Sequence, residues 1–239
     1  MTERLIVDDL AFDVQRSSRR KTVELTVDRG GELRISAPPE ADTAWLEGFV
    51  REKRFWLYTK LAEKELLQHP VTERQFVTGE SYPYLGRSYR ILLVDEQSDP
   101  LKLVAGRFRL RRDAQREGRQ AFVAWYSNRA TEWLRQRVRE WAPRMESEPQ
   151  ALEVRDLGFR WGSCARGSKL FFHWATILLP PSIIDYVIVH ELAHLHEANH
   201  TPEFWRRVRR ALPTCDEQRA WLAQHGGRHT APLMADGNS

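Results

Sequence analysis

Four of the eight histidines in this 239-residue chain lie between positions 190 and 200. His190 and His194 are four residues apart, so on a helix their imidazoles lie one turn apart on the same face. Two imidazoles placed in this way can bind one Zn²⁺ ion at about 2.0–2.1 Å. Glu191 follows the first histidine and can take a proton from a water molecule that the ion activates. The spacing therefore predicts a metal site suited to hydrolysis, with Glu191 as the general base.

A third ligand can come from His200, provided that the helix ends before it. Six more residues of straight helix would carry His200 about 9 Å along the axis beyond His194. Asn199 tolerates a left-handed conformation, and Thr201-Pro202-Glu203 has the order of a helix cap, an N1 proline and an acid. We therefore expect the chain to break at Asn199, to present His200 to the same ion, and to pack a new helix through Phe204, Trp205 and Val208.

Other side chains near the motif have different interpretations. His196 points away from the ligand face, and we expect it on the surface. Glu197 returns to that face, and two roles are open for it: a contact with one of the ligand residues, or a ligand of the ion itself. Tyr186, two turns before His194, is expected to pack in the core. Cys164 is not expected to act as a nucleophile, because no separate base is indicated for it.

The motif helix must be positioned by the elements around it. Pro180-Pro181 precede it, and Ser182 and Asp185 have the spacing of a capping box. A long helix with apolar residues at helical spacing is predicted from Gln115 to Met145, followed by a strand-like part from Leu152 to Leu179. These segments predict a small sheet and a long helix beside the metal helix.

The N-terminal part is predicted to be rich in strands. Apolar residues alternate from Leu5 to Ala37, which is typical of a hairpin or meander, and Asp42 can cap a helix that runs to about Leu67. A second strand-rich stretch, Phe76 to Leu110, is expected to extend the first sheet. The fold class is therefore α+β: an N-terminal β-rich region at 1–112, a zincin-like catalytic region with its HExxH helix against a small sheet at 113–225, and a loose tail at 226–239.

Composition narrows the class of protein. Two cysteines are too few for a disulfide framework, and we expect a cytoplasmic protein without a membrane segment. The net charge of +4 is a mild basic excess, so a nucleic-acid partner is possible but not indicated.

At this point the sequence resembles the YgjP-like metal-dependent hydrolases, which are similar to a wider group of zinc peptidases. The resemblance rests on four segments: Ser18 to Val23, Tyr84 to Tyr89, Arg160 to Cys164, and the metal helix continued to Trp205. The histidine spacing is also similar to that of metzincin peptidases, although Glu197 stands where those have a glycine. The Arg160 to Cys164 segment suits a tight turn between strands, and we favour this interpretation over a substrate-binding wall.

The resemblance implies a peptidase fold with a C-terminal zinc helix, while some relatives are described as hydrolysing UTP to UMP and pyrophosphate. Peptide hydrolysis is the leading hypothesis, and hydrolysis of a nucleoside triphosphate at the same metal site is the alternative. A binding module with a structural zinc is the third, but such sites usually close with four protein ligands and three are visible here.

The arginines distinguish a peptide substrate from a nucleotide substrate. Triphosphate hydrolysis needs several cations that converge on the phosphates, whereas a peptidase needs an open groove. We expect at least one cation from the first strands or the Arg160 segment to lie near the metal; the candidates are Arg19, Arg20, Lys21, Arg87 and Arg160.

Overall fold

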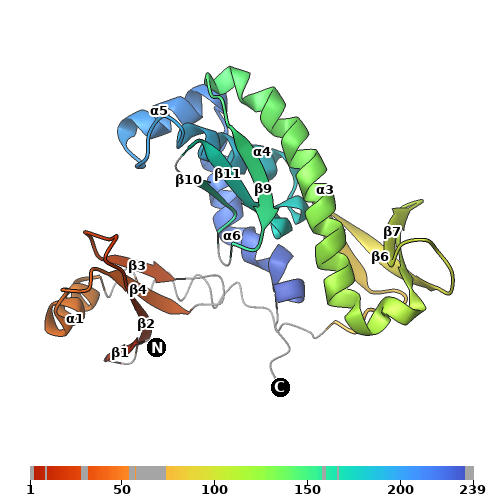
Figure 1. The fold of residues 1–239 in the computed structure, drawn as a ribbon, viewed down its shortest axis with the longest axis horizontal. Helices are drawn as coiled ribbons and strands as arrows, with labels where there is room; N and C mark the ends of the chain where they lie inside the picture. The colour runs from red at the N-terminus through yellow and green to blue at the C-terminus, as the bar shows by residue number, and fades with distance from the viewer. Residues whose placement is uncertain are drawn as a thin grey trace. The chain divides into compact units, whose positions relative to one another are not determined.

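The computed structural model describes residues 3–8, 10–27, 32–53, 57, 74–157, 160–165 and 167–234, without the side chains of 223 and 227–234. The chain divides into two compact units, Met1–Pro70 and Val71–Ser239, each with its own hydrophobic core. This division differs from the predicted boundary at position 112. The fold is mixed α+β, as the sequence predicted, with several small sheets (Figure 1).

The first unit contains a four-stranded sheet and a helix. Its strands are paired in the order β1-β2-β4-β3, with β2 and β4 parallel. The Asp42 carboxylate caps helix α1 by accepting a hydrogen bond from the Trp45 amide at 3.3 Å, as predicted. The helix ends at Glu52, and the rest of the segment predicted to reach Leu67 lies outside the described residues, apart from Lys53 and Leu57. The elements are β1 (Glu3–Val7), β2 (Leu10–Arg16), β3 (Glu24–Val27), β4 (Leu33–Ala37) and α1 (Thr43–Glu52).

The second strand-rich stretch forms a separate sheet, so the prediction that it extends the first one was wrong. Its strands pair in the order β5-β6-β8-β7. The reason is the partner of its apolar face: Tyr82 stacks on Phe122 of the long helix α3 at 4.1 Å between ring centroids, and Phe108 meets the same ring at 5.0 Å. These elements are β5 (Ser81–Tyr84), β6 (Arg87–Val94), β7 (Leu101–Val104), β8 (Arg107–Arg111), the 3₁₀ turn η1 (Arg112–Glu117) and α3 (Gly118–Trp141).

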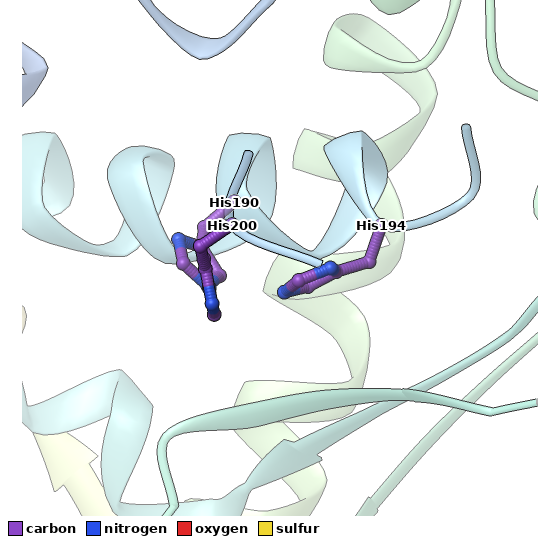
Figure 2. A group of neighbouring side chains, drawn as sticks. All are labelled: His190, His194 and His200. Atoms are coloured by element: carbon purple, nitrogen blue, oxygen red, sulfur yellow. The ribbon is translucent and has the colours of Figure 1, made fainter. Parts of the chain in front are cut away.

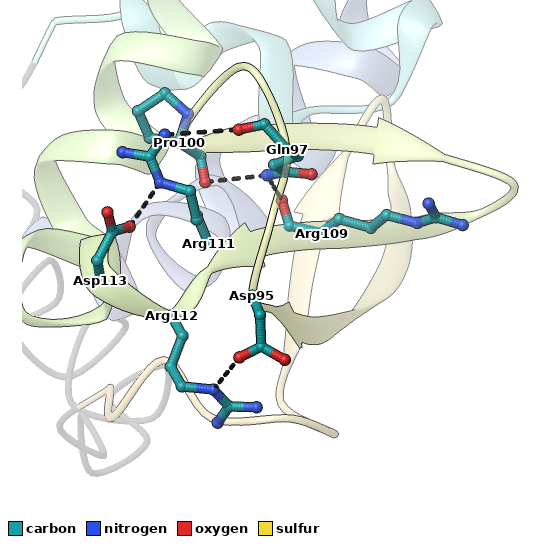
Figure 3. A network of polar contacts seen from close by, with 7 residues as sticks. All are labelled: Asp95, Gln97, Pro100, Arg109, Arg111, Arg112 and Asp113. Carbon is teal, nitrogen blue, oxygen red and sulfur yellow. Dashed lines mark hydrogen bonds and ion pairs between the residues drawn. The ribbon is translucent and has the colours of Figure 1, made fainter.

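Four arginines lie close together in the sequence at positions 107, 109, 111 and 112, and some of them have a structural role in this sheet (Figure 3). Arg111 pairs with Asp113 at 2.6 Å, and Arg112 pairs with Asp95 at 2.9 Å. The Gln97 amide donates to the Arg109 carbonyl at 2.8 Å and so ties the loop after β6 to β8. Two of these arginines are therefore partnered by carboxylates of the same sheet.

A third sheet and three helices complete the second unit. The sheet has the order β10-β11-β9, with β10 and β11 antiparallel and β11 and β9 parallel. Helix α3 lies alongside β9, and α4 contacts β10 (Figure 1). The remaining elements are the 3₁₀ turns η2 (Pro143–Met145) and η3 (Trp174–Leu178), strands β9 (Ala151–Arg155), β10 (Gly162–Ala165) and β11 (Lys169–His173), and helices α4 (Pro181–Ala193), α5 (Pro202–Ala211) and α6 (Cys215–Met234).

The last described part of the chain is helical. Helix α6 continues to Met234, whereas the sequence predicted a loose tail from Gly226. Gly226 is buried, and a Cβ atom there would come within 2.9 Å of Cζ2 of Trp161. Helix α6 therefore passes close to the Trp161 indole at Gly226. Among the described helices, none has the length and apolar composition that crossing a membrane would require.

Candidate metal centre

Helix α4 begins with prolines and not with the predicted capping box. Pro180 is the N-cap, Pro181 is in the first turn, and no side chain caps the helix. Asp185 instead pairs with Arg137 of α3, whose Nε donates to its carboxylate at 2.9 Å. Asp185 therefore forms an ion pair between two helices and does not cap α4. Proline at N1 is sufficient to start the helix, because a backbone N–H at that position would have no helical partner.

Helix α4 ends before His200, as binding of one ion by all three histidines requires. Its last residue is Ala193, with His194 as the C-cap, and the amides of Leu195 and His196 bond back to Leu192 and Ala193 in a closing turn. Asn199 does not have the predicted left-handed conformation, because the non-glycine residues with positive φ in the described part of the chain do not include it. The reversal is made by this turn and by a tight bond from the Thr201 amide to the Asn199 carbonyl at 2.8 Å.

Helix α5 packs the returning segment against the histidines, as predicted. The Thr201 hydroxyl accepts the Phe204 amide at 3.3 Å, and Pro202 lies in the first turn. Phe204 is fully buried, with its ring centroid 5.0, 4.6 and 4.7 Å from those of His190, His194 and His200. One phenylalanine thus supports all three imidazoles.

The three predicted histidines lie together. Their candidate ligand nitrogens all fall within 4.8 Å of one another, and Nε2 of His190 is 3.0 Å from Nε2 of His200. Figure 2 shows His190 and His194 coming from the end of α4, and His200 reaching the same space from the segment that returns beside it. His194 donates its Nδ1–H to the Glu197 carbonyl at 3.0 Å, which leaves Nε2 with a free lone pair.

The chemistry of these donors fits a metal ion. Burial, followed by the charges of the other two histidines, lowers the pKa of His190 to about 3, and burial also lowers the pKa of His200. Both rings are therefore neutral near pH 7 and can donate a lone pair. Ligand nitrogens of a tetrahedral zinc site are about 3.3 Å apart, so small ring rotations bring these nitrogens into place. Three imidazoles suit zinc, and they also fit other transition metals.

Glu191 lies on the buried side of α4. Its side chain is 6% exposed, and burial raises its pKa to about 8, although the charge of Arg160 opposes this shift. A carboxyl group with such a pKa can both accept and return a proton near neutral pH. A Cβ atom on Gly162 would come within 2.7 Å of both Cγ and Oε1 of Glu191, so β10 lies directly against this carboxyl group.

The contact with Gly162 changes the interpretation of the Arg160 to Cys164 segment. Gly162–Ala165 is strand β10 and not a tight turn, and the Trp161 carbonyl accepts hydrogen bonds from the His173 amide and the Thr176 hydroxyl. Sequence reasoning missed Gly162, although a glycine beside a tryptophan in this segment was a signal of close backbone approach. Among the five cations named from the sequence, Arg160 is near enough for its charge to act on Glu191.

The other residues near the motif lie mostly as expected. His196 is exposed, with Nε2 2.9 Å from the Ser147 hydroxyl. Glu197 contacts the site through its backbone carbonyl, and Tyr186 is buried, with its pKa raised to about 12 by burial. Burial also raises the pKa of the Cys164 thiol, which keeps it protonated and argues against a role as nucleophile.

Three imidazoles around one point, with a buried carboxyl group beside them, define a class of protein that can hold a metal ion through histidines. The family comparison specifies this class: the model of the YgjP-like metallopeptidase domain matches residues 21–225, and the chain belongs to this family. Membership implies a bound metal. The chain is also similar to a solved structure, the crystal structure of the metallopeptidase zymogen of Pyrococcus abyssi abylysin. The two sequences are 20% identical, and the match covers 36% of this chain and 90% of that chain with a TM-score of 0.34. None of the curated proteins compared with this chain matches it.

Proposed function

We propose that this protein is a zinc-dependent metallopeptidase with a zincin-like site, in which His190, His194 and His200 hold the ion and Glu191 is the general base. The observation that carries the proposal is the convergence of three imidazoles beside a buried glutamate whose pKa is raised to about 8. Three protein ligands leave one coordination position open, which is typical of catalytic zinc sites. This argues against a purely structural zinc.

The residues divide the chemistry between them. A zinc ion held by the three imidazoles would supply a Lewis acid that lowers the pKa of a water molecule to about 7. Glu191 would take a proton from the water that adds to the peptide carbonyl carbon, and would return it to the amide nitrogen as the C–N bond breaks. Phe204, packed against all three rings, keeps the imidazoles in position and excludes solvent from one side of them.

Strand β10 supports a peptide as the substrate. In the described part of the chain β10 is an edge strand, paired with β11 alone. An extended peptide can add to such an edge through main-chain hydrogen bonds, which recognise any sequence. Because Gly162 on this strand touches Glu191, a peptide bound along β10 would pass close to the general base.

Hydrolysis of a nucleoside triphosphate such as UTP at the same site is the second candidate. The observation in its favour is Arg160, whose charge acts on Glu191 and could bind a phosphate there. Arg20 does not add to this argument, because it pairs with Glu24 at 2.6 Å within the first unit.

The test is an assay of zinc-loaded protein against two panels, one of unfolded proteins and one of nucleoside triphosphates, with Glu191→Gln as the blank. We expect peptide cleavage that depends on Glu191, measured by mass spectrometry of the products. Glu191-dependent release of pyrophosphate without peptide cleavage would replace the leading proposal by the second candidate.

The contact between Gly162 and Glu191 gives a further expected result. In Gly162→Ala the new methyl group must displace the Glu191 carboxyl, because it would start 2.7 Å from Oε1. We expect kcat on a cleaved peptide to fall by about tenfold to a hundredfold, with metal content unchanged. Gly48→Ala is the matched control, since a Cβ there meets nothing within 4 Å. An unchanged kcat in Gly162→Ala would show that β10 does not position the base.

A further inference from the structure

A second cation lies beside the histidines, on the side of Trp205. The guanidinium carbon of Arg219, from α6, is 4.6 Å from the centroid of the Trp205 ring. The same indole stacks on His200, with ring centroids 5.7 Å apart and an interplanar angle of 25°. Trp205 therefore links the arginine directly to one of the three imidazoles, and the cation–π contact holds the guanidinium in place.

The charge of Arg219 acts on the histidines themselves. It contributes, after burial and the neighbouring histidines, to the lowered pKa of both His190 and His200. A positive charge at this position also opposes the binding of a metal cation by the same rings, because like charges repel. An anion bound at Arg219 would reduce this repulsion.

No carboxylate among the described residues forms an ion pair with Arg219. The charge of Asp216, one turn earlier on α6, acts on Arg219, but the Asp216 carboxylate pairs with Arg209 at 3.1 Å, and no ion pair or hydrogen bond ties Arg219 to another described side chain. The helix itself is fixed: α6 packs on α4, Cys215 at its start is fully buried, and Gly226 packs against Trp161. A fixed helix presents a held guanidinium whose N–H donors are available to a ligand.

We propose that Arg219, held over Trp205, binds an oxyanion group of the substrate next to the metal. The shared chemistry is a carboxylate or a phosphate, either of which a guanidinium can bind with two parallel hydrogen bonds. This inference rests on the proposed function for its site and extends it, since it makes the substrate anionic at one defined position. Arg219 would thereby select substrates by their negative charge, whereas the edge of β10 would bind the main chain of a peptide of any sequence.

The test measures binding, so that it does not depend on peptidase activity. Zinc-loaded full-length Glu191→Gln protein, in which turnover is removed, is titrated calorimetrically with N-acetylglycine, with its neutral analogue N-acetylglycinamide, and with inorganic phosphate. Arg219→Gln in the same background should weaken binding of the anionic probe by about tenfold, with Arg219→Lys between the two. The matched control is Arg210→Gln, since Arg210 on α5 has a side chain that is 85% exposed.

The outcomes separate the two sources of the oxyanion. A loss of affinity confined to N-acetylglycine assigns the position to a peptide carboxylate, and a loss confined to phosphate assigns it to a phosphate group. Binding of both probes that is unchanged by Arg219→Gln, or absent from the parent protein, overturns the proposal. So does loss of zinc or a melting temperature lowered by several degrees in Arg219→Gln alone, because the residue would then be structural. The failure of the proposed peptidase function would appear separately, as a lack of peptide cleavage by the wild-type protein.

Discussion

Replacing His190, His194 or His200 by alanine should remove the bound metal, and the three variants should behave alike. Each supplies one of three nitrogens that lie within 4.8 Å of one another, and a metal left with two protein ligands is exposed to water. We expect affinity for zinc to fall by more than about a hundredfold in each variant. Elemental analysis after dialysis measures the loss, and the melting temperature should cease to respond to added zinc.

The control for these variants is His196→Ala. His196 is exposed and directs Nε2 to Ser147 and to the Met145 carbonyl, so it should keep full zinc content. These variants also test whether His200 is the third ligand of the ion. Full zinc in His200→Ala, with loss in Glu197→Ala or Glu203→Ala, would show that an acid of this segment holds the ion in place of His200.

Local signals in the sequence predicted the parts of the site that local geometry determines. The spacing of His190, Glu191 and His194 requires only a helix, and the order of Thr201 and Pro202 requires only a helix start. Both are present in the structure. The prediction that the chain breaks between the second and third histidines followed from the length of a helical turn, and it is correct even though Asn199 does not adopt the conformation assigned to it.

Some sequence patterns were compatible with two structures, and contacts with residues distant in the sequence determined which of the two formed. Ser182 and Asp185 have capping-box spacing, but an arginine 48 residues earlier, Arg137, binds Asp185 instead. The strands of residues 81–111 alternate like those of the first unit, yet their apolar face packs on Phe122. In both cases a distant partner decided between arrangements that were locally equivalent.

The same limit explains which site residues were missed. Gly162 precedes Glu191 by 29 residues and Arg219 follows it by 28, and each reaches the site only through the packing of its strand or helix. No spacing rule connects them to the motif. Phe204 was expected only to pack its helix, whereas its ring contacts all three imidazoles.

Glu191→Gln should abolish turnover while leaving metal content and fold intact. Glutamine has the shape of glutamate, but its amide cannot accept a proton from water near neutral pH. General-base catalysis contributes about a hundredfold to ten-thousandfold, so we expect kcat to fall by about a thousandfold or more. Because Glu191 is 6% exposed and its pKa is raised by burial, removing its charge should not destabilise the protein.

Three measurements on one preparation distinguish catalysis from structure: kcat on a cleaved peptide, zinc content, and the melting temperature. Glu153→Gln is the matched control, because Glu153 is an exposed acid on β9, and the same chemical change there should leave all three values as in the wild type. A Glu191→Gln protein that retains zinc and stability but loses turnover assigns the proton transfer to this carboxyl group. Turnover within a few-fold of wild type would remove Glu191 from the mechanism and with it the reason for its burial against Gly162.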